Sequence, residues 1–422
     1  MLRKTTYRLI LGLSAATLAV SAVPGSAHHV AAAGWQAPVL VSATQANRET
    51  SLVVHPQNPD EVFLCDPSGV PAVFDNQSYF HRTTNGGATW SPVRVETLAT
   101  DTRQYTFEGG DCDVAYDAGG TLWSADTWLG NLSIGHSADG VNWQGTALAT
   151  TAPVVDRPWI VGGPPGTLYV TYQDLQCCSP SAMWFTKTTD YGATFSPAVP
   201  ITTFASADGP YTWEGNFVVA NGGNDIYLVY SRRLQSGAGV VVNGLPAVIS
   251  LASSHDGGAT WASTDIARIP RETSSIYPSI GMDAGGYLHV AWAAPRASDN
   301  PIFYTSSSDG GSTWSSVVTL VNGKTGQAPW VAGGPAAGQA AIAWLGSPDA
   351  VAGPFSDWYF YVAKVNGSSV SVATTTTDPV WTGEQVVPEF EAVRYDKNGK
   401  LHLGMSVFQA PNQWAVFYQR ET

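Results

Sequence analysis

The stretch Ser306-Ser307-Ser308-Asp309-Gly310-Gly311-Ser312-Thr313-Trp314 has four variant copies elsewhere in this 422-residue chain. The Asp or Asn position of the five copies falls at Asn85, Asp139, Asp190, Asp256 and Asp309. Asp and Asn accept hydrogen bonds from nearby backbone and Gly adopts positive φ, so the motif is typical of a tight turn. Apolar runs precede and follow it, as in Ile302-Phe303-Tyr304 and Val317-Val318-Thr319-Leu320. Each copy is therefore predicted to form the tip of a β-hairpin.

The copies follow one another at intervals of 54, 51, 66 and 53 residues, with no helical pattern between them. This regular period predicts a repeat array of small sheets, and we expect an all-β fold, a β-propeller of four-stranded blades. The pattern S-x-D-x-G-x-T-W resembles the Asp-box of the sialidase (bacterial neuraminidase repeat, BNR) superfamily. The resemblance covers roughly residues 47–320 directly.

The end of the chain decides the number of blades. Six blades account for about residues 47–380, and residues 389–396, 401–408 and 414–418 supply only three more strands. The fourth is expected at residues 37–42, whose sequence resembles the outer strand at residues 91–95. Closing the ring in this way removes exposed sheet edges. We expect seven blades closed by the N-terminal strand, with six as the alternative.

The N-terminus has the pattern of a secretory signal peptide. Residues 1–8 are basic, residues 9–23 are apolar, and small residues follow up to Ala27. We therefore expect residues 1–27 to be removed and residues 28–422 to form one propeller domain that is secreted. Loss of Arg3, Lys4 and Arg8 would change the net charge from −13 to −16. This charge argues against nucleic acid as a partner, and no later segment predicts membrane insertion. We expect a monomer.

The four cysteines, Cys65, Cys112, Cys177 and Cys178, permit three pairings, and none has the C-x-x-C spacing of a zinc site. Cys177 and Cys178 could bond to each other, or each could bond to one of the other two. In an exported chain a structural disulfide is favoured over a redox role.

Strand direction predicts which face carries chemistry. The turns between first and second strands lie on the same face as the Asp-boxes. This face has tight turns and few spare functional groups, so we interpret the Asp-boxes as structural. The longer connections between second and third strands, and between blades, lie on the opposite face around the channel mouth. One motif recurs there, as Pro158-Trp159-Ile160-Val161-Gly162-Gly163-Pro164 and Pro329-Trp330-Val331-Ala332-Gly333-Gly334-Pro335.

The resemblance implies an exo-sialidase-like glycoside hydrolase acting on an anionic glycan. Sialidases use a Tyr nucleophile, and arginines bind the substrate carboxylate. The residues that we assign to these roles are Asp156 or Asp111 as acid/base, Tyr211 or Tyr277 as nucleophile, Glu214 or Glu108 as its activator, and Arg157, Arg232 and Arg296 as the carboxylate clamp. The family's Arg-Ile-Pro tripeptide occurs as Arg268-Ile269-Pro270, but after an Asp-box in blade four rather than near blade one.

Other interpretations stay open. The chain could be a non-catalytic glycan- or protein-binding propeller, or a polysaccharide lyase using a Tyr–His pair such as Tyr79 and His81. No cofactor is required. Asp111 and Asp113 alternate across Cys112, so they could share Ca²⁺ with Asp126 or Glu108, or equally cap neighbouring backbone.

Overall fold

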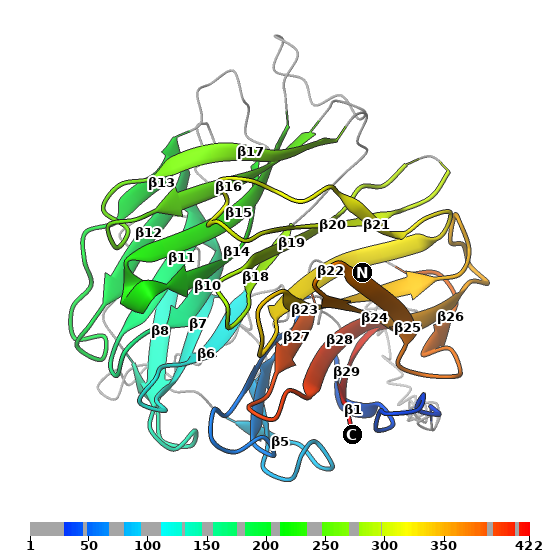
Figure 1. Cartoon of the computed structure of the whole chain (residues 1–422). Coiled ribbons are helices and arrows are strands. Elements are labelled where there is room, and N and C mark those ends of the chain that lie inside the picture. Colours follow the sequence, from blue (N-terminus) through cyan, green and yellow to red (C-terminus); the bar gives the residue numbers. More distant parts are fainter. Residues whose placement is uncertain are drawn as a thin grey trace, which may run out of the picture.

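The computed structural model describes residues 29–44, 49–66, 80–93, 111–128, 131–145, 155–174, 182–203, 212–233, 247–269, 278–296, 298–385, 391–409 and 413–422. These residues form seven antiparallel blades arranged in a ring, so the predicted all-β, seven-bladed propeller is confirmed (Figure 1). The predicted signal peptide lies outside the described residues. Among the described residues, no helix is long and apolar enough to cross a membrane.

Within each blade the strands follow one another from the channel outward. The bounds in blades one to three are β2 (Ser51–Val54), β3 (Val62–Cys65), β4 (Phe80–Thr83) and β5 (Ser91–Val93); β6 (Cys112–Tyr116), β7 (Leu122–Trp128), β8 (Asn131–Ser137) and β9 (Gln144–Gly145); β10 (Val155–Gly162), β11 (Leu168–Asp174), β12 (Ala182–Thr188) and β13 (Val199–Thr203). The first strands β2, β6 and β10 lie against one another around the channel.

The remaining blades repeat this order. Their bounds are β14 (Thr212–Ala220), β15 (Asp225–Arg233), β16 (Ala247–Ser254) and β17 (Ala262–Ile269); β18 (Ser279–Met282), β19 (Leu288–Ala293), β20 (Ile302–Ser307) and β21 (Val318–Val321); β22 (Thr325–Gly333), β23 (Gln339–Ser347), β24 (Asp357–Asn366) and β25 (Ser369–Thr374), with β26 (Trp381–Thr382) beside β24; and β27 (Ala392–Tyr395), β28 (Leu401–Gln409), β29 (Gln413–Arg420) and β1 (Val39–Thr44). The one helical element among the described residues is the short turn η1 (Asn221–Gly223).

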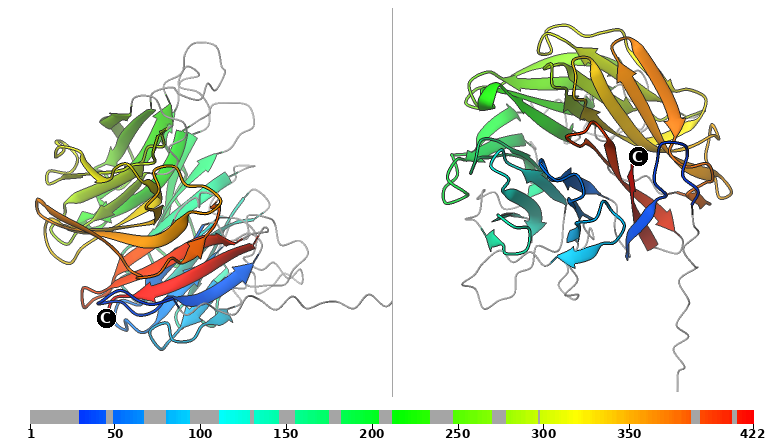
Figure 2. Two further views of the ribbon diagram at one scale, coloured as in Figure 1. Left: turned by 90° about the vertical axis from the view of Figure 1, so that its right-hand side faces the viewer. Right: turned by 60° about the horizontal axis from the view of Figure 1, so that its bottom comes forward.

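The N-terminal strand closes the ring, as predicted. β1 pairs antiparallel with β29, from Val39 opposite Tyr418 to Thr44 opposite Trp414, and the two strands lie side by side in Figure 2. The segment before β1 extends the closure, because the Ala32 N–H donates to the Thr375 carbonyl of blade six at 3.0 Å. The last blade is thus built from both ends of the described chain.

The Asp-boxes form the predicted turns. In blade five, the Asp309 carboxylate accepts the Thr313 N–H at 2.8 Å and the Thr313 hydroxyl at 2.6 Å, and the Ser307 hydroxyl accepts the Gly311 N–H at 2.8 Å. These bonds hold the pKa of Asp309 at about 2. The aromatic residue that ends a box packs on the preceding blade, as Trp261 does on Phe185 with ring centroids 5.6 Å apart.

The turns between first and second strands lie on the same face as the Asp-boxes, which we call the Asp-box face. Backbone bonds join the two sets, for example from the Gly257 N–H to the Asn224 carbonyl at 3.0 Å. The connections between second and third strands and between blades lie on the other face, which we call the loop face.

Two tryptophans meet inside the channel. Trp159 of blade three and Trp330 of blade six are 3% and 2% exposed, and their ring centroids lie 5.1 Å apart. Blades three and six are not neighbours in the ring, so this contact crosses the channel. Both residues come from the repeated Pro-Trp motif. The Trp159–Trp330 pair therefore lies in the channel between its two mouths.

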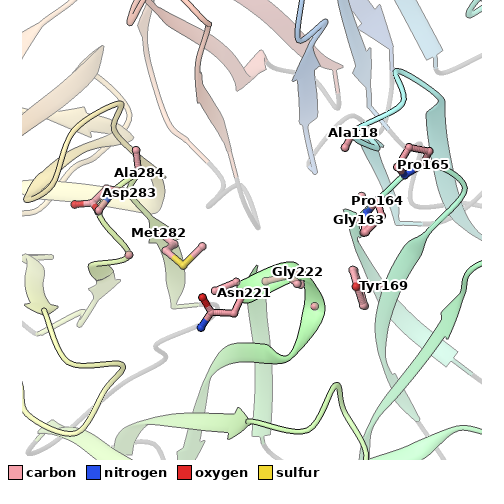
Figure 3. A pocket seen from close by; sticks show the side chains of 16 residues that line it. Ala118, Gly163, Pro164, Pro165, Tyr169, Asn221, Gly222, Met282, Asp283 and Ala284 are labelled. Atoms are coloured by element: carbon pink, nitrogen blue, oxygen red, sulfur yellow. The ribbon is translucent and has the colours of Figure 1, made fainter.

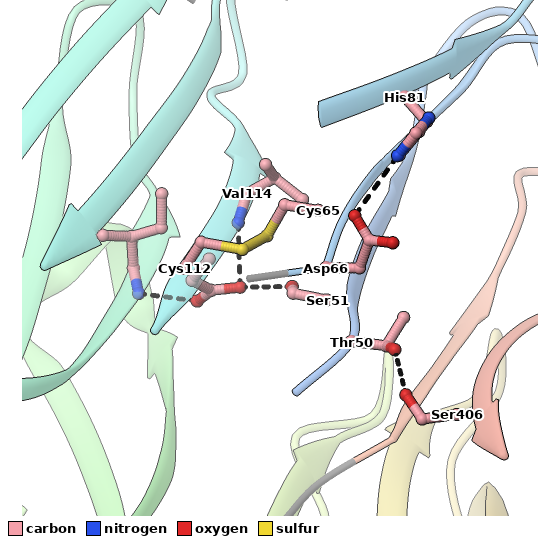
Figure 4. The surroundings of a disulfide bond; sticks show 10 residues. Thr50, Ser51, Cys65, Asp66, His81, Cys112, Val114 and Ser406 are labelled. Atoms are coloured by element: carbon pink, nitrogen blue, oxygen red, sulfur yellow. Dashed lines mark hydrogen bonds and ion pairs between the residues drawn. A yellow bond between two sulfur atoms is a disulfide. The ribbon is translucent and has the colours of Figure 1, made fainter. Parts of the chain in front are cut away.

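A disulfide joins blades one and two. Cys65 ends β3 and Cys112 begins β6, with Cα atoms 6.4 Å apart (Figure 4). This selects one of the pairings that the sequence left open, and Cys177 and Cys178 lie outside the described residues. The bond lies at the loop-face ends of both strands.

Two buried histidines link strands to turns. In blade seven, hydrogen bonds join His402 Nδ1 to the Tyr418 hydroxyl at 2.7 Å and His402 Nε2 to the Asp396 carboxylate at 3.5 Å. His289 of blade five has equivalent bonds to Tyr304 and Asp283. Burial lowers the pKa of His402 from 6.5 to about 4, against the opposing effect of Asp396.

We predict that His402 makes the fold acid-sensitive. Because its pKa is lower in the folded than in the unfolded chain, the unfolded chain binds the proton first, and stability is lost as the pH falls from about 6.5 towards 4. Urea unfolding across this range should show a loss of the order of 3 kcal/mol from this residue. His402→Asn should flatten the dependence, whereas His255→Asn, at a 63% exposed histidine, should not. An unchanged slope in His402→Asn would contradict the assignment.

Candidate functional site

Ionisable side chains gather where the first strands start, at the loop-face mouth of the channel. The buried ones among the described residues are Glu49, Asp111, Asp113, Arg157, Glu214 and Glu391. They come from blades one, two, three, four and seven, so residues far apart in sequence meet at one opening. Buried charges need partners, and these partners indicate what each residue does.

Arg157 links three blades at this mouth. Its guanidinium lies 3.7 Å from Glu49 and 3.8 Å from Asp111, and its backbone N–H donates to Asp111 Oδ2 at 3.2 Å. The three side chains are only 6%, 8% and 12% exposed, respectively. This places one cation between two carboxylates in a largely dry environment, where electrostatic interactions are strong.

Arg157 also has an unusual backbone. Its φ is 55°, and it lies in a β-bulge between Asp156 and Trp159, directly before Pro158. A left-handed conformation costs a non-glycine residue about 1–2 kcal/mol. Ala328 has the same bulge in blade six, with φ 48° before Pro329 and Trp330. The bulge is therefore a feature of the repeated motif, and blade three alone places a cation on it.

Glu391 is a carboxyl group without a balancing cation among its contacts. It is fully buried before β27, its Oε2 accepts the Ser406 N–H at 2.7 Å, and its Oε1 has no hydrogen-bond partner. Burial raises its pKa well above the ordinary value. Burial therefore favours the protonated form of Glu391 relative to an exposed carboxyl. The sequence places Glu391 and Glu49 on the loop face, before first strands as Asp111 is, but the specific catalytic roles were assigned to other residues.

Asp113 fastens neighbouring blades together. One oxygen accepts the Ser51 hydroxyl at 2.5 Å and the Val114 N–H at 2.9 Å, and the other accepts the Ile160 N–H of blade three at 2.8 Å; two of these bonds end at labelled partners in Figure 4. Burial raises the pKa of Asp113, and the nearby Arg394 opposes that effect.

The same fastening recurs elsewhere in the ring. Asn216 of blade four accepts the Ile280 N–H at 2.8 Å, and Ser279 of blade five accepts the Val331 N–H at 3.0 Å. Asp113 therefore occupies a structural position of the repeat. Among the described residues, no group of three His, Cys, Asp or Glu side chains that could hold a metal ion is found, and Glu108 lies outside those residues, so the Ca²⁺ site at Asp111, Asp113 and Asp126 stays a prediction.

The three arginines of the expected clamp have different surroundings. Arg232 donates to Asp265 of the outermost strand β17 at 2.8 Å, and Arg296 lies over the Phe303 ring at 5.6 Å from its centroid. Neither shares a described partner with Arg157. Side chains of a second strand alternate between the two faces of the blade, and those of Arg232 and Arg296 contact outer elements.

Other candidates are described only in part. Glu108, Tyr211, Tyr277 and Tyr79 lie outside the described residues, and Asp156 is described only by its backbone. Glu214 is fully buried in β14, opposite Tyr230. His81 lies 3.3 Å from the buried Asp66 (Figure 4). Burial raises the pKa of Asp66, and the nearby His81 opposes part of this effect.

The other mouth of the channel has a different chemistry. A hollow of about 810 Å³ opens on the Asp-box face, lined mainly by turn residues such as Ala118, Gly163, Asn221 and Met282 (Figure 3). Its one lining carboxylate, Asp283, accepts bonds from Gly285, Tyr287 and Gly338 and contacts His289. The chemically equipped mouth is therefore the one on the loop face.

No family model matches the chain, and no curated protein matches it in sequence. Solved structures share its fold. The polysaccharide lyase Uly1 has a TM-score of 0.56 at 11% identity, over 96% of this chain and 94% of that one. A PL25 ulvan lyase bound to -[GlcA(1-4)Rha3S]- has a TM-score of 0.55 at 13% identity, over 90% and 95%.

A protein of unknown function from Dyadobacter fermentans has a TM-score of 0.52 at 13% identity, over 78% of this chain and 98% of that one. At such identities the comparisons show a common propeller fold. The resemblance to the sialidase superfamily remains an inference from the Asp-boxes.

We predict that Asp113→Ala weakens the ring. It would leave the buried N–H groups of Val114 and Ile160 without acceptors, at a cost of about 3 kcal/mol in unfolding free energy. Asn216→Ala should cost a similar amount for the same reason. Thermal unfolding of both variants, with Ca²⁺ and with a chelator, measures this. A stabilisation by Ca²⁺ that disappears in Asp113→Ala would instead make Asp113 a metal ligand.

Proposed function

We propose that this protein is a carbohydrate-active enzyme that cleaves glycosidic bonds of an anionic glycan at the loop-face mouth of its channel. The observation that carries the proposal is Arg157, held between Glu49 and Asp111 from two other blades, at the loop-face mouth where Glu391 also precedes a first strand. Glycoside hydrolysis needs one carboxyl that donates a proton and a second group that acts as nucleophile or base.

The described residues can be assigned to these roles. Glu391, kept uncharged by burial, protonates the leaving oxygen. Asp111 or Glu49 acts as the carboxylate, or activates a tyrosine if Tyr211 or Tyr277 is the nucleophile, as in the sialidase-like version. Arg157 orients the substrate's anionic group. Arg232 and Arg296, expected in the clamp for a sialic acid carboxylate, have no part in this arrangement. We therefore propose a hydrolase of anionic glycans without specifying the sugar.

A lyase is the second candidate. Elimination needs a base, a proton donor and a group that neutralises the uronate carboxylate. The buried His81–Asp66 pair supplies an acid–base couple at the end of β3, and Arg157 a neutralising cation. Two proteins with the same fold are polysaccharide lyases, one of them bound to a glycan with GlcA and Rha3S units.

The test is turnover by the purified protein on sialosides, polyuronates and sulfated polysaccharides, with product analysis. Arg157→Ala should lower kcat/KM about a hundredfold or more. Glu391→Gln should lower it about 10²–10⁴-fold on substrates with poor leaving groups but much less on aryl glycosides, whose leaving group needs no proton. A folding defect would affect both substrate types equally.

Asn221→Gly, at the opposite mouth, is the matched control and should keep full activity. Saturated reducing-end products identify a hydrolase, and unsaturated uronates identify the lyase. Full activity in both Arg157→Ala and Glu391→Gln would contradict the proposed site, as would the absence of turnover on every anionic glycan.

A further inference from the structure

A second hollow lies on the outer part of the ring, between blades four and five. Its volume is about 350 Å³, within the range of small-ligand sites. Ala267, Arg268 and Ile269 of β17 line one side, and Trp292, Arg296 and Phe303 of blade five line the other. It thus contains the Arg-Ile pair of the tripeptide and Arg296, which the catalytic arrangement leaves unused.

The hollow has an aromatic wall. Trp292 and Phe303 lie with ring centroids 5.8 Å apart and planes inclined by 32°. Trp292 is 2% exposed, and its indole N–H has no acceptor. The half-buried Phe303 offers an aromatic face, which suits a ligand with an apolar face and polar edges, such as a sugar ring.

The hollow also has two exposed cations. Arg268 and Arg296 are 74% and 50% exposed, and each lies 3.9 Å from its nearest carboxylate, which is longer than a hydrogen bond. Asp265, the neighbour of Arg268, already accepts a bond from Arg232 at 2.8 Å. The two guanidinium groups therefore keep donors for an external anion.

Arg82 is a useful comparison for Arg296, because its guanidinium is hydrogen-bonded to a carboxylate. Like Arg296 it lies over a ring, 5.5 Å from the centroid of Phe63. Its guanidinium, however, donates two bonds to Glu61, at 2.6 and 3.0 Å, and is only 22% exposed. The same stacking is thus present with the charge neutralised within the protein.

Arg296 borders one further hollow, of about 210 Å³, between blades five and six. Gln327 and Glu384 line it, and Gln327 Oε1 is buried without a hydrogen-bond partner. Gln327 directly precedes Ala328, the bulge residue beside Trp330 in the channel. The two hollows share Arg296 and so adjoin one another at this side chain.

We propose that the hollow between blades four and five is an ancillary subsite that binds an anionic sugar unit of a polysaccharide. Arg268 and Arg296 bind its carboxylate or sulfate, and Phe303 and Trp292 contact its ring. The chain carries a net charge of −13, so local cations are needed to retain an acidic polymer. The identification of the polymer as substrate rests on the proposed function; the subsite itself does not.

The experiment measures binding by calorimetry in the Arg157→Ala variant, which lacks the cation proposed to bind an anionic group at the loop-face mouth. The ligands are a uronate oligosaccharide, a sulfated oligosaccharide and a neutral one of equal length. At least one anionic ligand should bind, and Arg268→Ala/Arg296→Ala should weaken it about tenfold. Phe303→Ala should weaken it less, and the preferred ligand distinguishes carboxylate from sulfate.

Arg82→Ala is the control for charge and should not change the affinity. Equal binding by the double variant and its parent, or no binding of either anionic ligand, would overturn the subsite. If the protein turns over no glycan but the double variant loses binding, the result would support the subsite and contradict the proposed enzymatic function. In an active protein the double variant should raise KM for the polymer while kcat on a short substrate stays unchanged.

Discussion

The antiparallel pairing of β1 with β29 is the constraint on which the rest of the structure depends. Without it, blade seven would have three strands, and β29 would be an unpaired edge. With it, seven first strands surround one axis and their loop-face ends converge. Residues as distant in sequence as Glu49, Arg157 and Glu391 then share one mouth, and Thr50 and Ser406, 356 residues apart, are joined by a 2.5 Å hydrogen bond.

The two faces of the ring, on either side of the Trp159–Trp330 contact, differ in the surroundings of their charged residues. On the Asp-box face, the carboxylates are occupied with turn backbone, as Asp309 and Asp283 illustrate. On the loop face, Arg157 and Glu391 are in costly states, one with a left-handed backbone and one with a buried carboxyl whose pKa is raised. Such states persist where the surrounding structure imposes them, and they concentrate at functional sites.

Much of the fold was predictable because its determinants are local. The Asp-box is a short-range hydrogen-bond network, so its residues identify the turn, and its spacing gives the blades. The site was predictable only in part. Asp111 and Arg157, which the sequence places on the loop face, lie 3.8 Å apart, whereas the positions of Glu391 and Glu49 relative to them depend on ring closure. Arg232 and Arg296 were grouped with Arg157 because their loops share a face, although their side chains contact outer elements. The Cys65–Cys112 pairing depends on how two blades align, and sequence spacing does not encode this.

The most direct measurement is a crystal structure of Arg157→Ala with an acidic oligosaccharide bound. If the loop-face mouth is the active site, sugar density will lie above the Trp159–Trp330 pair, with a glycosidic oxygen within hydrogen-bond distance of Glu391 and an anionic group where the Arg157 guanidinium had been. Density confined to the hollow at Asn221 and Met282, on the Asp-box face, would contradict the account.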